Sequence, residues 1–314
     1  MKKKIARILL VTVFGAAPLS TSLHAANSAA PFLTITPSPI YSALSVRGTA
    51  RIDDANSIFI NPGGLGAMRG GQFSAVHTQL FTDSTFNTLS YGQSLGQSKG
   101  ALGLGVMYLR KGTIEGRDEN QMSTGGYSAD DLALSLGYGQ RLRNGITLGS
   151  TAKMIRQRID SYSATAAALD LGAQFSPVSR ISLGASINNL GTSVKFISEK
   201  ESLPLSGNLG ISYKVGAVNL IADSSTLLRE SRTQFGFGMA FQPISALSLR
   251  GGYSVGSVAS RASSVSKSDS FGGFAGFGAG LGFTMERFQL DYALMPQEEL
   301  APVHQFSLTV KVGP

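Results

Sequence analysis

The stretch ALGLGVMYL (residues 101–109) decides the fold of this chain. Its large apolar residues, at positions 102, 104, 106 and 108, alternate with Gly103, Gly105 and Met107. Successive side chains of a β-strand point to opposite faces, so this spacing puts the large side chains on one face and mostly small ones on the other. An amphipathic helix would need apolar residues three and four positions apart. The stretch therefore predicts a strand with one apolar face.

The same alternation recurs at residues 131–139, 182–188, 235–241 and 288–294. A soluble β-sandwich would bury the apolar faces and expose charged ones, whereas a membrane barrel turns its apolar faces to lipid and closes on itself. Here the second face is mostly Gly, Ser, Ala, Thr and Asn, and many segments end in Tyr, Phe or Arg beside a turn. This pattern favours the barrel, with Tyr and Phe forming the interfacial girdles because Trp is absent.

The candidate strands give an estimate of the barrel's size. They are residues 71–79, 84–92, 100–109, 130–141, 145–158, 163–175, 180–190, 206–215, 217–224, 232–242, 246–256, 271–284, 286–294 and 304–312. The fold class is thus all-β, a transmembrane antiparallel β-barrel of about 14 strands, and bacterial barrels have even strand numbers. Twelve and sixteen strands stay open, because residues 257–282 are ambiguous. Residues 257–270 and 112–130 are expected to be long loops.

Composition excludes several other classes of protein. Charged residues are only 15% of the chain, against about 25% in soluble domains. The mean hydropathy is +0.10, but beyond the first thirty residues no apolar run approaches the ~18 residues that a membrane helix needs. The apolar fraction of 42% argues against disorder. With no Cys, the chain has no disulfide, thiolate metal site or Cys nucleophile.

The first 25 residues have the pattern of a secretory signal peptide. Lys2, Lys3, Lys4 and Arg7 precede an apolar run over residues 8–17, and small residues lead to an expected cleavage after Ala25. No Cys follows that point, so a lipoprotein is excluded. Four of the 27 basic residues lie in this leader, which leaves 23 basic and 19 acidic residues, a net charge of +4. That mild excess does not support nucleic-acid binding.

Residues 26–70 interrupt the strand pattern. Three prolines in residues 31–39 discourage regular pairing, and residues 53–68 end in a strong turn signal. The segment is either a loop between strands or a plug, also called a hatch, folded inside the barrel. The candidate plug motif comprises Asp53, Asp54, Asn56, Asn61, Pro62, Gly63 and Gly64. The expected division of the chain is a signal peptide (1–25), a plug segment (26–70) and a barrel (71–314).

No catalytic, metal or cofactor site is expected. His77 and His304 each stand alone on a strand, without carboxylates at ligand spacing. Residues 252–256 match G-x-S-x-G, but no helix follows them as a nucleophile elbow requires. The glycines of residues 276–282 alternate with apolar residues, as one face of a strand would. Lys153, Arg156 and Arg158 are a candidate basic ladder lining a pore, or else a strand end at the headgroup level.

The stretch DDANSIFINPGGLG (residues 53–66) resembles the N-terminal signature of the PorV/PorQ family of outer-membrane proteins, relatives of the FadL-type fatty-acid channels. The resemblance continues through residues 100–120, 130–142, 148–175, 182–197, 285–296 and 304–312, in matching order and spacing. It implies a fourteen-stranded barrel in the outer membrane of a Gram-negative-type bacterium, with an N-terminal segment associated with the lumen.

Two departures from the family pattern concern the plug and the C-terminus. The family usually has a Gly-rich stretch before the Asp-Asp pair, whereas here Arg51-Ile52 leads directly into Asp53-Asp54, which implies a shorter plug. Outer-membrane barrels usually end in an aromatic residue that assists assembly. This chain has Val312 at that position and finishes Gly313-Pro314.

Three functions follow as hypotheses. The favoured one is a FadL-like passive channel for hydrophobic or amphipathic small molecules. The alternative is a non-transporting PorV-type barrel that docks or shuttles secreted proteins, as in type IX secretion. Long loops would suit this docking role. The third, an outer-membrane hydrolase, lacks a supporting Ser/His pair, so we do not expect an enzyme. Expected partners are outer-membrane lipid and lipopolysaccharide, a hydrophobic solute, and secretion-system or cargo proteins.

Overall fold

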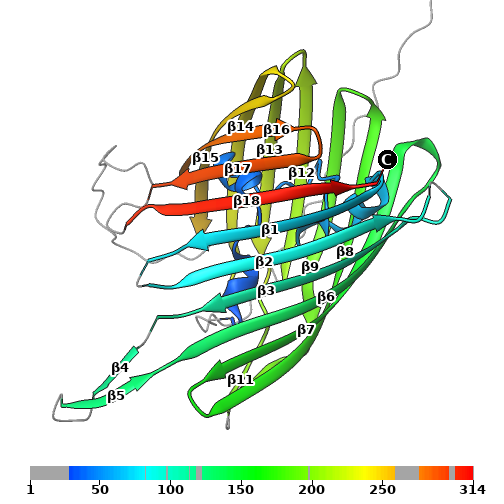
Figure 1. Cartoon of the computed structure of the whole chain (residues 1–314). Coiled ribbons are helices and arrows are strands. Elements are labelled where there is room, and N and C mark those ends of the chain that lie inside the picture. Colours follow the sequence, from blue (N-terminus) through cyan, green and yellow to red (C-terminus); the bar gives the residue numbers. More distant parts are fainter. Residues whose placement is uncertain are drawn as a thin grey trace, which may run out of the picture.

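The computed structural model describes residues 28–81, 83–96, 98–112, 114–117, 122–196, 199–258, 276–296 and 301–313 (Figure 1). The expected signal peptide and its cleavage site lie outside these residues. No helix in the described part of the chain combines the length and apolar character that crossing a membrane requires.

Fourteen strands from the described residues close into one antiparallel barrel, which confirms the predicted fold class. Neighbours in sequence pair in turn around the wall, and β1 pairs with β18 to close it, with Gly71 opposite Val312. The strands are β1 (Gly71–Gln79), β2 (Thr85–Ser94), β3 (Ala101–Arg110), β6 (Ala129–Arg141), β7 (Ile146–Ile159), β8 (Tyr162–Val178), β9 (Ile181–Gly191), β12 (Ser206–Val215), β13 (Val218–Leu227), β14 (Arg232–Ile244), β15 (Leu247–Val258), β16 (Phe277–Met285), β17 (Phe288–Met295) and β18 (Val303–Val312). Closure leaves none of these fourteen barrel strands with an unpaired edge.

The predicted strand boundaries are mostly within three residues of those in the structure. The main difference is at β16, which begins at Phe277 after a turn at Gly276, whereas residues 271–275 of the predicted strand lie outside the described residues. The predicted loop over residues 257–270 begins too early, because β15 continues to Val258, and its remainder lies outside the described residues.

The two ends of the barrel differ in their connections. At one end, here called the turn end, short links such as residues 142–145, 179–180 and 286–287 join the strands, and the barrel's first and last strands begin and end there. The other end, the loop end, carries the longer links. One of these was expected to be a loop over residues 112–130, but it contains the hairpin β4 (Ile114–Arg117) and β5 (Ser123–Tyr127), whose pairing satisfies backbone groups. A second hairpin joins β10 (Val194–Phe196) to β11 (Glu199–Glu201).

The large apolar side chains face outward. On β3, Leu102, Leu104 and Tyr108 are exposed, whereas Gly103 and Gly105 between them are buried. Exposed aromatic residues form a girdle near each end of the wall. The turn-end girdle consists of Phe73, Tyr91, Tyr138, Phe175, Tyr213, Phe241, Phe283 and Phe288, and the loop-end girdle of Tyr108, Tyr162, Phe235, Tyr253, Phe277 and Phe306. An apolar outer band between aromatic girdles is the surface that a bilayer requires.

The described part of the N-terminal segment, residues 28–70, lies inside the barrel, where Figure 1 shows its short blue helices between the walls. Its elements are η1 (Pro31–Thr34), α1 (Pro39–Ala43), α2 (Ser57–Ile60) and η2 (Pro62–Ala67). It starts at the loop end, where the backbone N–H of Ala29 donates to Ser202, and it leaves at the turn end to enter β1. The segment therefore runs along the length of the bore.

Candidate functional site

Glycines line the inner face of the wall where the N-terminal segment meets it. A Cβ added at Gly149, Gly184, Gly236 or Gly252, on four different strands, would collide with a backbone carbonyl of the segment. Glycine suits positions where another backbone approaches closely, because it has no side chain. The face of small residues predicted for the lumen is thus a close-fitting seat for residues 28–70.

Asn61, from the predicted plug motif, fastens the segment to itself and to the wall. Its side-chain amide donates to the carbonyls of Thr49 (2.8 Å) and Ala173 (3.1 Å), and its Oδ1 accepts the N–H of Gly63 (3.1 Å) at the start of η2. Asn61 is fully buried. Pro62 and Gly63 lie directly against β7 and β8. Gly64 packs under Ile52 within the segment.

Asn56 makes a second attachment, on another part of the wall. Its Nδ2 donates to Ser74 Oγ of β1 (3.2 Å), and its Oδ1 accepts from Ser90 Oγ of β2 (2.9 Å). All three side chains are buried. The structure therefore brings the motif residues Asn56 and Asn61 into the same role, which is to hold the segment against the wall.

Polar wall residues that the sequence analysis did not single out complete this attachment. Asp223 on β13 accepts the backbone N–H groups of Gly48 (2.6 Å) and Thr49 (3.0 Å). Gln174 on β8 donates to the carbonyl of Ile52, and Asn188 on β9 donates to that of Ile60. Buried backbone groups need such partners. The only signal in the sequence was a polar residue in place of a small one on an inner face.

Two cavities lie in the bore, one toward each end, and the α1 turn lies between them. Ile40, Tyr41 and Leu44 line the turn-end cavity, of about 830 Å³, whereas Ser42 and Val46 line the loop-end cavity, of about 780 Å³. The N-terminal segment thus divides the space inside the barrel.

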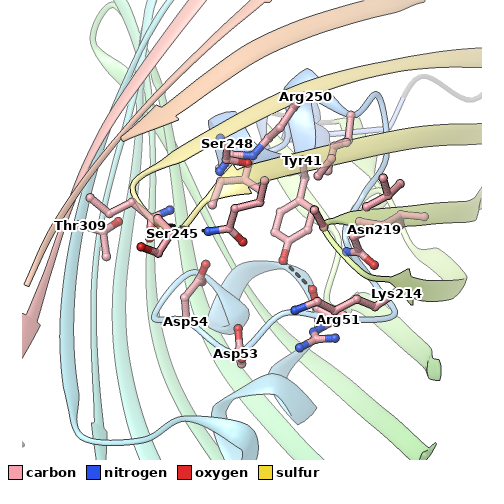
Figure 2. A pocket seen from close by; sticks show the side chains of 18 of the residues that line it. Tyr41, Arg51, Asp53, Asp54, Lys214, Asn219, Ser245, Ser248, Arg250 and Thr309 are labelled. Atoms are coloured by element: carbon pink, nitrogen blue, oxygen red, sulfur yellow. Dashed lines mark hydrogen bonds between the residues drawn. The ribbon is translucent and has the colours of Figure 1, made fainter. Parts of the chain in front are cut away.

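The turn-end cavity is lined by charged groups (Figure 2). Asp53 and Asp54 of the segment share it with Arg51, Lys214 of β12 and Arg250 of β15, and the Tyr41 hydroxyl donates to the Arg51 carbonyl (2.6 Å). Burial, together with the negative charge of Asp53, raises the pKa of Asp54 to about 7. Asp54 also accepts the backbone N–H of Asn56 (2.8 Å). The paired motif carboxylates therefore face the cavity and do not contact the wall's glycines.

The loop-end cavity has a more apolar lining. Ile35 and Val46 of the segment face it together with Leu80, Met295 and Val303 from the strand ends. Charged groups are also present, because Arg47, Asp223 and Arg232 line it. The loop-end cavity is therefore amphipathic, because apolar side chains and a comparable number of polar ones line the same space.

The structure does not bring Lys153, Arg156 and Arg158 into one basic ladder. Lys153 faces the bore and is buried, whereas Arg156 and Arg158 are exposed on the opposite face of β7. Side chains an odd number of positions apart on a strand point to opposite faces, which is why the ladder cannot form. Arg158 pairs with Asp130 (2.6 Å) on the neighbouring strand.

Lys153 instead belongs to a buried polar cluster on β7, β8 and β9. Its Nζ contacts Asp170 Oδ2 at 2.6 Å and donates to Asn189 Oδ1 at 2.9 Å, and the N–H of Asn189 donates to Asp170 Oδ1 at 2.7 Å. Asp170 sits at a register shift between β8 and β9, typical of a β-bulge. The cluster neutralises the lysine inside the wall.

A second buried ion pair crosses one whole strand. Arg250 on β15 contacts Asp291 on β17 at 2.7 Å, and both face the bore over Gly282 of β16. A Cβ at Gly282 would lie 2.6 Å from both side chains. Neither ion pair was predicted, because the strand register that aligns the partners is not visible in the sequence.

The histidines make simple hydrogen bonds. His77 Nδ1 lies 2.7 Å from Asn87 Oδ1, and His304 Nδ1 lies 2.9 Å from the Tyr292 hydroxyl. Within the described residues, no group of three or more His, Asp or Glu residues is arranged to hold a metal ion. The Gly252–Gly256 motif lies within β15.

Comparisons with known proteins agree with this architecture. A family model, described as "Uncharacterised protein family (UPF0164)", matches residues 21–289. A comparison with curated proteins found no match. Among solved structures, the Ralstonia pickettii toluene transporter TbuX aligns with 12% identity and a TM-score of 0.63, covering 88% of this chain and 98% of that one. The Pseudomonas putida toluene transporter TodX (15%, 0.58, 86% and 96%) and a Pseudomonas aeruginosa FadL homologue (9%, 0.59, 88% and 99%) are also similar. At these identities the likeness shows a shared fold.

Proposed function

The chain belongs to the UPF0164 family, and from this starting point we propose that it is an outer-membrane channel for small hydrophobic or amphipathic molecules. The observation that carries the proposal is the pair of cavities separated by residues 28–70 inside a barrel with a lipid-facing surface. A solute would enter the amphipathic cavity at the loop end and pass to the turn end when the segment shifts. The names of TbuX, TodX and the FadL homologue support this kind of function by analogy of fold.

The orientation follows from the loop lengths. Outer-membrane barrels have short periplasmic turns and longer extracellular loops. The loop end would then face outward and present the amphipathic cavity to the surroundings. Passage would need no cofactor or energy source, because the solute would move down its own concentration gradient.

A crosslink between the segment and the wall tests this proposal. The chain has no Cys, so Ala50→Cys with Gly210→Cys introduces a single pair, and a Cβ at position 210 would lie 3.2 Å from the Ala50 Cβ. The same Cβ would also collide with Asp223 Oδ1, so the Asp223 carboxylate must shift to accept it. Disulfides need a Cβ–Cβ separation of about 3.5–4.5 Å, so a small adjustment allows the bond. Uptake of toluene and of a labelled long-chain fatty acid would be measured in bacterial cells that lack such a channel.

We expect the reduced double variant to take up the solutes and the oxidised form to lose most of that uptake. The Gly210→Cys single variant, treated with the same oxidant, serves as the control for the added side chain. A folded protein that supports no uptake in any form would refute the channel. Equal uptake by the locked and reduced forms would refute the gating role of the segment.

The second candidate is a non-transporting barrel that docks secreted proteins, as the PorV/PorQ resemblance implies. The observation that favours it is the β4–β5 hairpin, which extends beyond the barrel wall (Figure 1). A variant lacking residues 113–127 would then lose capture of a secreted cargo protein in crosslinking experiments. If the barrel is a channel instead, the same variant keeps its solute uptake.

A further inference from the structure

Eight basic residues surround the turn end of the barrel. They occupy the strand ends and short turns on that side, and all are exposed: Arg69, Lys99, Arg141, Arg143, Arg180, Lys214, Arg287 and Lys311. We call this set the basic rim. Among the described residues of the same turns and strand ends, Glu286 is the one acidic side chain. Asp53 and Asp54 line the turn-end cavity, and so do Arg69, Lys214 and Lys311 of the rim. The rim residues outside the cavity lining, which are free to meet lipid, are Lys99, Arg141, Arg143, Arg180 and Arg287.

No rim side chain has an acidic partner in the described part of the chain. The ion pairs found there involve Lys111, Lys153, Arg158 and Arg250, none of which is in the rim. The loop end is different, because acidic residues such as Asp130, Asp160 and Glu230 are interspersed with its basic ones. The positive charge of the rim is therefore a local feature and does not simply reflect the net charge of the chain.

The turn-end aromatic girdle fixes the depth of the rim in a bilayer. Tyr213 directly precedes Lys214, and Phe288 directly follows Arg287. The other girdle residues lie within three positions of a turn-end strand terminus. Aromatic girdles mark the interface between hydrocarbon and headgroups. The rim, which is the next layer outward, lies at the level of the lipid phosphates.

We propose that the basic rim binds the phosphate groups of anionic phospholipids in the leaflet at the turn end. Guanidinium and ammonium groups form charge-assisted hydrogen bonds with phosphate oxygens. Several basic residues at one membrane surface attract anionic lipids, and each contributes separately. This binding would anchor and orient the barrel, and it does not depend on what the bore conducts. An acidic protein would be a different class of partner, and the lipid-preference measurement distinguishes it from anionic lipid.

The test measures lipid preference in nanodiscs of phosphatidylcholine with a minor fraction of phosphatidylglycerol. Spin-labelled lipids report how strongly each lipid type associates with the protein. We expect phosphatidylglycerol to associate at least about threefold more strongly than phosphatidylcholine at low ionic strength, and the preference to weaken with added salt. Changing Lys99, Arg143, Arg180 and Arg287 to Gln should remove most of it. These four residues lie in four separate turns and do not line the turn-end cavity.

A matched variant provides the control. Lys200, Arg110, Arg156 and Arg229 are also one lysine and three arginines, all exposed, at the loop-end half of the molecule. Changing them to Gln should leave the preference in place. Both variants are checked for a folded barrel by circular dichroism and by the heat-dependent shift in gel mobility before use.

Each remaining outcome supports the proposal or refutes it. If inorganic phosphate abolishes the preference at an ionic strength where chloride does not, free phosphate competes with the lipid for the rim, which supports recognition of the phosphate group itself. If the rim variant keeps the preference, or the control variant loses it equally, the rim does not bind lipid, and an acidic protein becomes the partner to test. Solute uptake by the rim variant should remain normal, so failure here leaves the channel proposal unaffected.

Discussion

Asp54 shows how a single residue can link the seating of the N-terminal segment to pH. Burial next to Asp53 raises the pKa of Asp54 to about 7, from a usual value of 3.8. The seated segment therefore holds a proton at a pH where the released segment would lose it. Protonation favours the seated state. The resulting stability is complete below the ordinary pKa and is lost as the pH rises through about 7.

We predict that the segment loosens between pH 5 and pH 8. Hydrogen exchange of residues 52–68, corrected for the intrinsic effect of pH, should accelerate by at least about tenfold, since one pKa unit corresponds to a tenfold change in the equilibrium. Asp54→Asn should flatten this dependence. Asp53→Asn keeps the titrating group but removes a neighbouring charge, so its transition should move to lower pH. Equal pH profiles for the natural chain and Asp54→Asn would contradict the role of this carboxyl.

At the scale of elements, glycines on the inner face of a strand act differently from glycines on its outer face. Gly251 and Gly252 are adjacent on β15. A Cβ at Gly252 would collide with the carbonyl of Leu44 in the segment, whereas one at Gly251 would meet only the Gly278 carbonyl oxygen, at 3.9 Å. The two positions are adjacent on the same strand, so comparing them isolates the contact with the segment.

We predict that Gly252→Ala displaces the α1 part of the segment and makes the closed barrel leaky. Ion conductance in planar bilayers and protease cleavage within residues 36–47 should both increase several-fold. Gly251→Ala should leave both unchanged, since it adds the same methyl group on the outer face. Because alanine is no worse than glycine in a strand, loss of the barrel is not expected from either change. If Gly252→Ala leaves the conductance and the protease cleavage unchanged, the wall has moved to accept the methyl group and the segment has kept its place.

The glycines also show how far the sequence can predict this molecule. Alternation at residues 101–109 predicted the strand and its outward face, because both depend only on neighbouring residues. The purpose of the inner glycines depends on contact with residues 28–70, which are distant in sequence. The ion pairs of Lys153 with Asp170 and of Arg250 with Asp291 depend on strand register, for the same reason. Motif residues Asn56 and Asn61 were predicted as part of a plug, but their wall partners could not be.

At the scale of the whole molecule, the size of the barrel makes an internal segment necessary if the bore is to be closed. Eight-stranded barrels are filled by their own side chains, whereas barrels of 16–18 strands leave an aqueous channel. This barrel has fourteen strands and glycine on much of its inner face, so its wall alone would leave an open bore, as in the larger barrels. Residues 28–70 occupy space in the bore that the side chains of the wall do not fill. Barrel and segment therefore pack together as complementary parts, with a cavity on each side of the α1 turn.

Deleting residues 28–70 should accordingly convert a closed barrel into an open, ion-conducting one. The wall pairs with itself without help from the segment, so the variant should still form a barrel, although with a lower melting temperature. Single-channel recording in planar bilayers would compare it with the full chain and with a variant lacking residues 113–127, which removes the β4–β5 hairpin that lies outside the bore. A separate peptide of residues 28–70, added during refolding, should restore closure, because its hydrogen-bonding partners Asp223, Gln174 and Asn188 remain on the wall. A folded deletion variant that stays closed would mean that wall side chains collapse into the bore, and the segment would then not be what closes the barrel.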